Sequence, residues 1–253
     1  NTTPMSCSRQ RQMCIRDSRC TQKCNDAGIK MCGTVSTIWG SPIGGATELK
    51  DAVEFSKRWL EIGAHDIEHA DHDGSASAPD VYRYFSMILD EMPDTDLHIA
   101  HFHETKRVAS ASVLAALQAG ITHFEATLGG LGGQPANFLD DCPVKGTGDY
   151  YYDDPRYVGL TCIEDLLVQV DEMGIEHGYD VDRMLWLGRA LEKTVGQRLR
   201  SEAVINGRTL KEGHMEYARP GLEKRKAKLG ETPGQNLPSD WAPQANLPER
   251  YRA

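Results

Sequence analysis

Strand-like and helix-like stretches alternate along the chain from Gly28 onward, and this alternation constrains the fold more than any other feature. Short apolar stretches predict strands at 29–38, 66–70, 97–100 and 122–127. Between them, apolar residues recur at helical spacing, which predicts helices over 48–62, 80–92 and 108–119. Gly63 and Gly120 follow two of these helices, where a left-handed C-cap favours glycine. The pattern is typical of a parallel α/β architecture.

The number of strand–helix units relates this chain to a barrel. A closed (β/α)8 barrel needs eight units and about 250 residues. The chain has 253 residues but only four units, within about 29–175. We therefore predict an α/β fold that is a partial TIM barrel over 19–206 and includes C-terminal helices at 162–173 and 181–199. The polar, proline-containing tail over 207–253 is expected to be mobile.

Charge and apolar content exclude several classes of partner. The chain has 28 Lys and Arg against 37 Asp and Glu, a formal net charge of −9, and no long basic run, so we expect no nucleic-acid binding. No window approaches the roughly 18 apolar residues of a membrane span, and the first residues lack a hydrophobic signal core. We expect a cytoplasmic protein without membrane contact, whose seven cysteines are reduced.

Two histidines follow the third predicted strand. His101 and His103 flank Phe102 directly after the apolar stretch 97–100. If this segment is extended, both imidazoles lie on one face and can bind one metal ion. The C-terminal ends of barrel strands are also where α/β barrels carry their active sites. The alternative is a pair of polar residues at a strand terminus.

Two further segments follow neighbouring strands. The carboxylates of Asp71-His72-Asp73-Gly74 would face the same edge of the sheet and serve an ion or a proton transfer, unless the segment is only a surface turn. Glu68 and His69 alternate within that strand, so one of them must point inward. The glycines of 129–135 would let backbone N–H groups approach a ligand, or form a flexible turn.

In order and spacing, four segments resemble the metal-dependent C–C lyase and Claisen-condensation barrels, above all the 3-hydroxy-3-methylglutaryl-CoA lyase family within the pyruvate carboxyltransferase-like superfamily. The segment 35–45 is similar to the family's VSCVLGCPYEG. Ala70-Asp71-His72 stands where the family has GDT, 101–105 where it has HCHDT, and 129–135 where it has AGLGGCP. The resemblance covers about 20–200 and matches the C-terminal half of the family's barrel, about strands five to eight.

The resemblance implies a role for each motif. His101 and His103 would ligate Mg²⁺ or Mn²⁺, and Asp71 would assist catalysis beside His101. The glycine loop would close over the substrate and exclude water. Its residues in this chain are Gly130, Gly132, Gly133 and Gln134. The implied substrate is an acyl-CoA or a 2-oxo or hydroxy acid.

Two positions depart from the family pattern. Gln134 replaces the loop cysteine thought to act in proton transfer, and a glutamine exchanges no proton at neutral pH. Leu160 stands where the family has an asparagine ligand, and a leucine cannot bind a metal. A long loop rich in Gly, Pro and Asp extends from residue 129 to about 155, and four of its residues could substitute as ligand: Asn137, Asp140, Asp141 and Asp149.

The first residues of the chain do not continue the resemblance. The family's first strand ends in Arg-Asp-Gly, which Arg16-Asp17-Ser18 imitates. Only about a dozen residues separate this segment from the strand at 29–38, whereas the family has four intervening units, so we reject the match. Residues 12–18 resemble a translated sequencing adapter, so we expect residues 1–18 to be non-native and the gene to continue upstream.

These observations favour a metal-dependent C–C lyase acting on a 3-hydroxy-3-methylglutaryl-CoA-like acyl-CoA, present as an incomplete fragment that is inactive alone. A Claisen-type acyl-CoA synthase or an aldolase of the same superfamily is one alternative. A noncatalytic metal-binding or subunit-contact protein is another. The full-length protein is expected to be a homo-oligomer.

Overall fold

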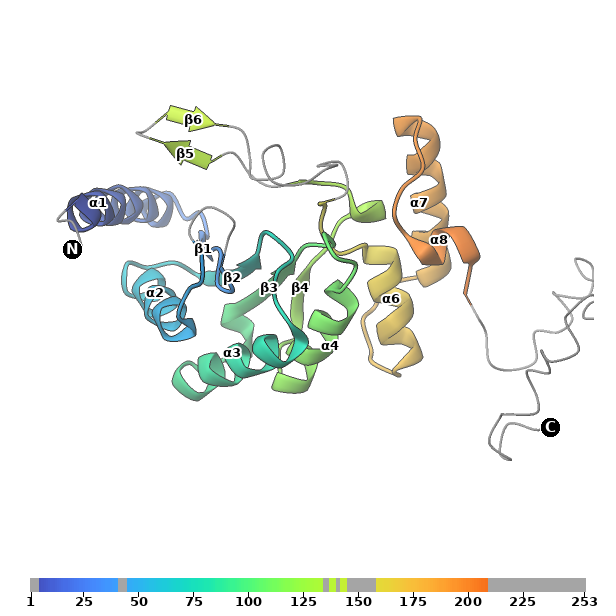
Figure 1. The fold of residues 1–253 in the computed structure, drawn as a ribbon, viewed down its shortest axis with the longest axis horizontal. Coiled ribbons are helices and arrows are strands. Elements are labelled where there is room, and N and C mark those ends of the chain that lie inside the picture. Colours follow the sequence, from blue (N-terminus) through green and yellow to red (C-terminus); the bar gives the residue numbers. More distant parts are fainter. Residues whose placement is uncertain (1–4, 41–44, 134–136, 140–141, 145–157, 209–253) are drawn as a thin grey trace, which may run out of the picture. The chain divides into compact units, whose positions relative to one another are not determined.

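A computed structural model describes residues 5–40, 45–133, 137–139, 142–144 and 158–208 (Figure 1). The chain divides into a unit of residues 1–207 and a unit of residues 208–253, and only Arg208 of the second is described. Gln134, Asp140, Asp141, Asp149 and nearly all of the predicted tail therefore lie outside the described residues. The expectation of a mobile tail stays a prediction.

Four parallel strands form the central sheet, in the order β1-β2-β3-β4. They are β1 Cys32–Val35, β2 Asp66–Asp71, β3 His98–Phe102 and β4 His123–Glu125. Each is connected to the next through a helix, which confirms the predicted α/β fold with a parallel sheet. Because parallel strands end at one edge, the segments that follow β2, β3 and β4 lie close together.

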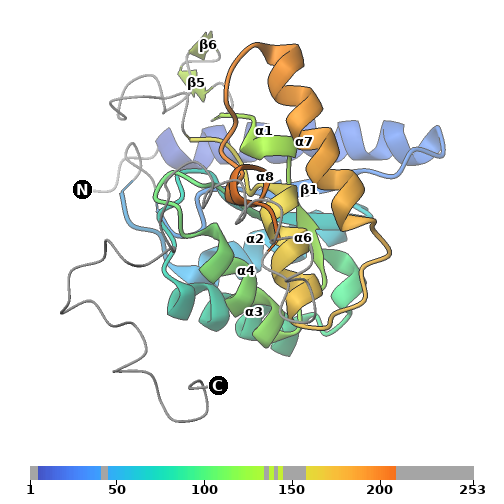
Figure 2. The ribbon, with the colours of Figure 1, turned by 90° about the vertical axis from the view of Figure 1, so that its right-hand side faces the viewer.

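The remaining elements surround this sheet or follow it in the chain. The helices are α1 Met5–Asp26, α2 Leu49–Glu61, α3 Ala78–Glu91, α4 Ala109–Ala119, α6 Ile163–Glu172, α7 Val181–Val195 and α8 Glu202–Asn206, with 3-10 turns η1 Thr95–Leu97 and η2 Leu128–Gly130. An antiparallel hairpin pairs β5 Asn137–Leu139 with β6 Cys142–Val144. In Figures 1 and 2, α3, α4 and α6 lie side by side, in agreement with their contacts.

Several boundaries differ from the predicted ones. β1 is shorter than 29–38 because only four of its residues pair with β2 and because Thr37 turns to a positive φ of 55°. β3 extends beyond 97–100 to include His101 and Phe102, since both stay in register with β2. α7 ends at Val195 rather than at residue 199, because Gly196 adopts the left-handed C-cap conformation with φ 69°.

Helix α1 and the hairpin of β5 and β6 were not expected from the sequence. The stretch from Met5 to Asp26 has no apolar periodicity, yet it contains neither glycine nor proline to interrupt a helix. Its C-terminal end is held to the turn after α2, where Asn25 Nδ2 donates to the Gly63 carbonyl at 3.0 Å. The non-native origin of residues 1–18 stays a prediction.

The helices cover one face of the sheet. Val35, Ile67, Ala100 and Phe102 point from three strands into a core completed by α2, α3 and α4, where Tyr84 and Phe85 are fully buried. The opposite face carries a different set of side chains, several of them polar. Thr34, Cys32 and His123 are exposed there, and Glu68, Ile99 and Glu125 are partly buried. The described part of the chain therefore buries only one face of its sheet under helices.

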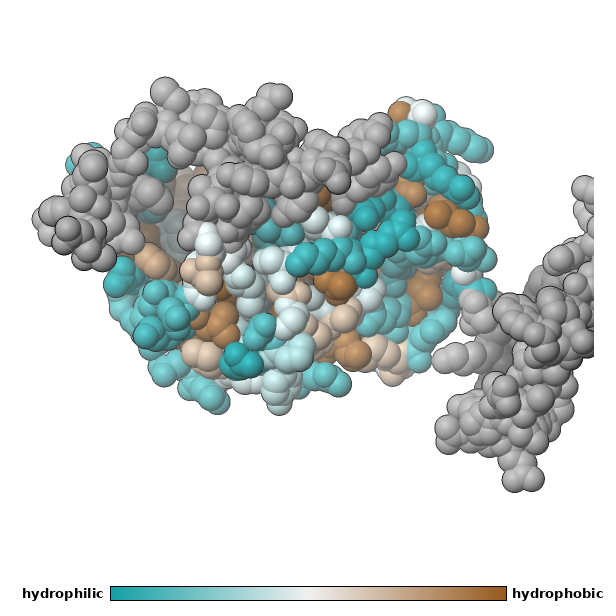
Figure 3. Space-filling model, in the orientation of Figure 1, coloured by the Kyte–Doolittle hydropathy of each residue, from teal (hydrophilic) through white to brown (hydrophobic). Residues whose placement is uncertain are grey.

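The surface of the described residues is mainly polar on the side shown in Figure 3, where hydrophobic side chains form small, separate patches. Within the described ranges, no helix has both the length and the apolar character that crossing a membrane requires.

A chain of hydrogen bonds runs through the core between the sheet and α3. His98 Nε2 lies 2.9 Å from the Met92 carbonyl, His98 Nδ1 lies 3.0 Å from His69 Nε2, and His69 Nδ1 lies 2.8 Å from Tyr84 Oη. The carbonyl can only accept, so each ring donates through Nε2 and Tyr84 Oη donates to His69. Burial lowers the pKa of His69 well below its usual value, and the proximity of His98 adds to this effect.

Replacing Tyr84 with phenylalanine should lower the free energy of unfolding by about 1–3 kcal/mol, because His69 Nδ1 would remain buried without a donor. Urea denaturation measures the change. The matched control is Tyr82→Phe on the same helix, where the side chain is 49% exposed and little change is expected. Equal effects of the two substitutions would contradict a stabilising role for the buried chain.

Candidate metal centre

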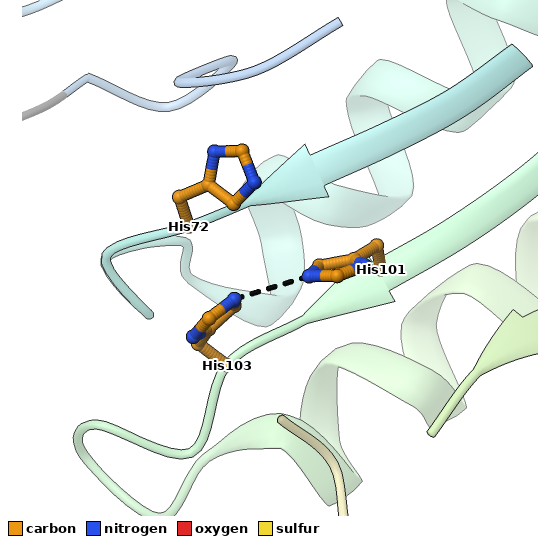
Figure 4. Close-up of side chains that lie close together, drawn as sticks. All are labelled: His72, His101 and His103. Atoms are coloured by element: carbon orange, nitrogen blue, oxygen red, sulfur yellow. Dashed lines mark hydrogen bonds between the residues drawn. The ribbon is translucent and has the colours of Figure 1, made fainter. Parts of the chain in front are cut away.

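Three histidines meet at the C-terminal edge of the sheet (Figure 4). His101 lies in β3 in register with Ala70 of β2, so the residues two positions further, His103 and His72, continue along the same face. His101 Nε2 lies 3.0 Å from His103 Nε2. The His72 ring stands nearly perpendicular to both, with ring centroids 5.5 Å from His101 and 5.7 Å from His103.

The hydrogen bonds of His101 and His103 fix where their protons lie. His103 Nδ1 is 2.6 Å from the Val158 carbonyl oxygen, and His101 Nδ1 is 2.7 Å from Glu125 Oε2. A carbonyl and a carboxylate only accept, so both Nδ1 atoms carry hydrogen. In neutral rings, both Nε2 atoms then present lone pairs to each other. Such a pair is stabilised by a proton or a cation that both nitrogens share.

The donor set fits a divalent ion. Two ligands at right angles on one ion, each about 2.1 Å from it, stand about 3.0 Å apart. The two Nε2 atoms are separated by this distance. A nitrogen of each of His72, His101 and His103 lies within 4.8 Å of the others. His101 and His103 are buried in the described structure, so an ion there would be largely withdrawn from water.

Two carboxylates support His101 from its other side. Besides Glu125, Glu68 Oε1 lies 3.4 Å from His101 Nδ1, and together the three form a second cluster. The bond from His101 lowers the pKa of Glu125. Burial raises the pKa of Glu68, opposed by His101 and increased further by the nearby Glu125. A carboxylate bound to the far nitrogen of a metal-ligating histidine commonly orients the ring and raises its basicity.

His103 and His72, the other two histidines of the cluster, are neutral. Burial lowers the pKa of His103 to about 4. The bond to the Val158 carbonyl opposes this shift, and the proximity of His101 adds to it. Burial also lowers the pKa of His72 to about 4, reinforced by His103 and His101. Both rings are therefore neutral near pH 7, the state in which an imidazole nitrogen can bind a metal.

The structure does not bring Asp71 to this cluster. Asp71 is in register with Phe102, on the face opposite His101. Its carboxylate accepts bonds from the backbone N–H groups of Ser75 and Ala76 and from the Ser75 hydroxyl, so it shapes the turn after β2. Burial raises its pKa, and these bonds oppose the change. Asp71 therefore lies on the other face of the strand pair from His101, and its predicted catalytic role stays a prediction.

The sequence alone does not indicate that His72 joins this cluster. In the segment 71–74, the carboxylate of Asp71 is the predicted functional group. The alternation of side chains along a strand narrows the choice only in part. If His101 and His103 share a face, the neighbouring strand can present either residue 71 or residue 72 to that face. Only the register, with Ala70 opposite His101, selects His72.

The glycine segment lies close to the histidines. Gly129, Gly130 and Gly132 have positive φ values of 61°, 64° and 133°. The Gly129 N–H donates to both carboxylate oxygens of the buried Glu164, at 2.8 and 3.0 Å. A cavity of about 230 Å³ adjoins the segment and is lined by Gly129, Gly130, Leu131 and residues 197–200. A Cβ added at Gly133 would meet no described atom within 4 Å, and Gln134 lies outside the described residues.

A segment after the long loop joins the glycines to the histidines. The Leu160 backbone bridges to His103, and the Glu104 N–H donates to the Gly159 carbonyl at 2.8 Å. A Cβ on Gly159 would collide with the Gly130 carbonyl oxygen, so the two backbones touch here. The Leu160 side chain offers no ligand atom, and no residue of 145–157 is described.

Fold and site together define a class: an α/β protein with a parallel sheet and a histidine cluster suited to a divalent ion at its C-terminal edge. The HMGL-like family model matches residues 8–190 of this chain. The chain belongs to the HMGL-like family, and the resemblance found in its motifs is confirmed. The match begins within the segment 1–18.

Two curated relatives of this chain are acyl-CoA lyases. The hydroxymethylglutaryl-CoA lyase of Pseudomonas mevalonii is 28% identical over 179 residues, which is 71% of this chain and 54% of the relative. The (R)-citramalyl-CoA lyase of Chloroflexus aurantiacus is 29% identical over 172 residues, or 68% of this chain and 49% of the relative. The chain spans about half the length of the curated relatives it matches.

Solved structures give the same relationship. An HMG-CoA lyase from Acinetobacter baumannii, in complex with coenzyme A and 3-methylmalate, is 28% identical with a TM-score of 0.65, covering 78% of this chain and 58% of that one. The carboxyl transferase domain of Rhizobium etli pyruvate carboxylase, at 16% identity and a TM-score of 0.54, covers 84% of this chain and 32% of that one and shares the fold.

Proposed function

We propose that the chain is the metal-binding part of a C–C lyase that acts on a 3-hydroxy-3-methylglutaryl-CoA-like acyl-CoA. The observation that carries the proposal is the His101 and His103 pair, whose Nε2 lone pairs converge at 3.0 Å. The names of the relatives support the substrate class, since they are lyases of hydroxymethylglutaryl-CoA and citramalyl-CoA. Both names denote hydroxylated acyl thioesters, so we infer a thioester substrate for this chain.

The proposed reaction divides one carbon skeleton into two. A base removes the proton from the substrate hydroxyl, the carbonyl forms at that carbon, and the adjacent C–C bond breaks. The electron pair of this bond goes to the thioester α-carbon as an enolate, which then takes up a proton. A divalent ion held by His101 and His103 would polarise the substrate oxygens, a contribution of several kcal/mol.

Residues around the ion would keep it and the substrate in place. Glu125 holds the Nδ1 hydrogen of His101 and thereby directs Nε2 toward the ion. The Val158 carbonyl does the same for His103. The glycine segment brings backbone close to this edge of the sheet, and the adjoining cavity of about 230 Å³ offers space for part of a ligand. We propose that Gly130, Gly132, Gly133 and Gln134 contact the substrate.

We further propose that the four strands correspond to about strands five to eight of the family's barrel. Support comes from the coverage, since the match extends over 58% of the Acinetobacter baumannii chain. It also comes from the sheet, whose second face carries Thr34, Glu68 and Glu125 without a described helix packed on it. Side chains of this kind lie inside a closed barrel, where neighbouring strands bury them.

The chain of residues 1–253 should self-associate, because an uncovered sheet face and the unpaired edge of β1 within the described sheet both recruit partners. Multi-angle light scattering at tens of micromolar, a range in which such contacts are commonly populated, should give a mass well above 28.0 kDa. A stable monomer of that mass would contradict the partial-barrel proposal.

The function itself is tested with the product of the complete reading frame at this locus. Genomic sequence upstream of the Arg19 codon shows whether further strand–helix units precede the described ones. We expect this product to cleave 3-hydroxy-3-methylglutaryl-CoA only with a divalent ion, with two products detected by mass spectrometry. His101→Ala should reduce turnover at least a hundredfold, whereas His65→Ala, an exposed histidine outside the cluster, should not. Turnover unaffected by a chelator and by His101→Ala would overturn the proposal.

A further inference from the structure

We propose that His72 is a third protein ligand of the ion and that the resulting three-imidazole site prefers a transition-metal ion, such as Co²⁺ or Zn²⁺, over Mg²⁺. The inference rests on the proposed function for the binding of an ion by His101 and His103. It goes further by adding a residue from a different strand and by assigning the chemical class of the metal.

His72 lies where it can face the other two histidines. His72 follows β2, whereas His101 and His103 come from β3 and the residue after it, so three ligands would converge from two neighbouring strands. Figure 4 shows the His72 ring beside the gap between the other two rings. One nitrogen of each ring lies within 4.8 Å of the others. Two nitrogens on opposite sides of one ion stand about 4.2 Å apart, so a small rotation of the ring suffices.

The alternative position for an ion is less favourable. Glu68 and Glu125 form their cluster around His101 Nδ1. Glu125 Oε2 lies 2.7 Å from that nitrogen, the distance of a direct charge-assisted hydrogen bond. This hydrogen occupies the lone-pair position of Nδ1, so Nδ1 cannot also bind an ion. The open lone pairs are the Nε2 atoms of His101 and His103, which lie on the side of His72.

The donor atoms determine the class of metal. Imidazole nitrogens suit Zn²⁺, Fe²⁺, Co²⁺ and Ni²⁺, whereas Mg²⁺ prefers oxygen ligands and retains water. In the described residues, the three side chains with ligand atoms at this point are all histidines, and neither carboxylate of the second cluster belongs to the group. A site with three nitrogen ligands would therefore bind a transition-metal ion more tightly than Mg²⁺.

Cobalt titration of the 253-residue chain tests the inference, because Co²⁺ absorbs visible light with an intensity that depends on its ligands. We expect Co²⁺ to bind at least a hundredfold more tightly than Mg²⁺ by calorimetry. His72→Ala should weaken Co²⁺ binding at least tenfold and change the visible spectrum. His72→Asn, which keeps a polar side chain, should change the spectrum as well. His65→Ala is the matched control, and circular dichroism of every variant shows that the fold is kept.

The outcomes separate this inference from the proposed function. If the chain binds Co²⁺, His101→Ala abolishes binding, and His72→Ala keeps both affinity and spectrum, His72 is not a ligand and only the inference fails. Equal affinities for Co²⁺ and Mg²⁺ would overturn the assigned metal class. If neither the unmodified chain nor any variant binds Co²⁺, or if His101→Ala has no effect, the metal centre of the proposed function fails as well.

Discussion

His101→Ala and His103→Ala will each weaken Mn²⁺ binding at least tenfold. Each substitution removes one of two nitrogens that lie 3.0 Å apart with converging lone pairs. Changes to groups that only orient a ligand typically cost 10–100-fold in affinity, and loss of the ligand itself should cost no less. Calorimetric titration with Mn²⁺ measures both constants, and His101→Ala should have the larger effect because it also leaves Glu68 and Glu125 without their shared partner.

The control for these two variants is His65→Ala, which removes an exposed histidine paired with Asp66 at the start of β2. It should leave Mn²⁺ binding unchanged. Unchanged affinity in both His101→Ala and His103→Ala would contradict a metal centre at this position, since no other described group has two open imidazole nitrogens at such a short separation.

Gly159→Ala should lower the free energy of unfolding by about 3 kcal/mol, the upper part of the usual range for overpacking. A Cβ at this position would collide with the carbonyl oxygen of Gly130, and a backbone atom cannot rotate away as a flexible side chain can. Either the glycine segment or residues 158–162 must move. Because the Val158 carbonyl holds His103 Nδ1, the second movement would also weaken metal binding.

Urea denaturation and Mn²⁺ titration of the same Gly159→Ala preparation separate these effects. Gly133→Ala is the matched control, because it makes the same change in the glycine segment where a Cβ would meet no described atom within 4 Å. We expect this control to unfold within about 0.5 kcal/mol of the unmodified chain. If Gly159→Ala were as stable as Gly133→Ala, the close contact between the two segments would not exist in solution.

The sequence was sufficient to predict the parallel sheet and the shared face of His101 and His103. Both follow from local rules, the alternation of apolar stretches and the two-residue repeat of a strand. His72 could not be selected in this way, because the choice between residues 71 and 72 depends on the register of β2 against β3, which is a long-range property. A catalytic role of Asp71 stays a prediction, and the bonds that its carboxylate accepts from the backbone of Ser75 and Ala76 are not indicated by any local sequence rule.

The helix ends, helix α1 and the two carboxylates at His101 also differ in whether local sequence rules could predict them. Glycines at 63, 120 and 196 mark helix ends by their backbone conformation, and two of the three were assigned from sequence. Helix α1 lacks an apolar stripe, so its periodicity gave no signal although its composition permits a helix. The side chains of Glu68 and Glu125 are far apart in sequence, and only strand pairing brings both to His101 Nδ1.

Anomalous diffraction from crystals of this chain grown with Mn²⁺ shows whether the histidine cluster binds a metal ion. We expect one anomalous peak within bonding distance of the Nε2 atoms of His101 and His103, on the side of His72. A peak bound to the carboxylates of Glu68 and Glu125 instead, or no peak near these histidines at saturating Mn²⁺, would contradict it.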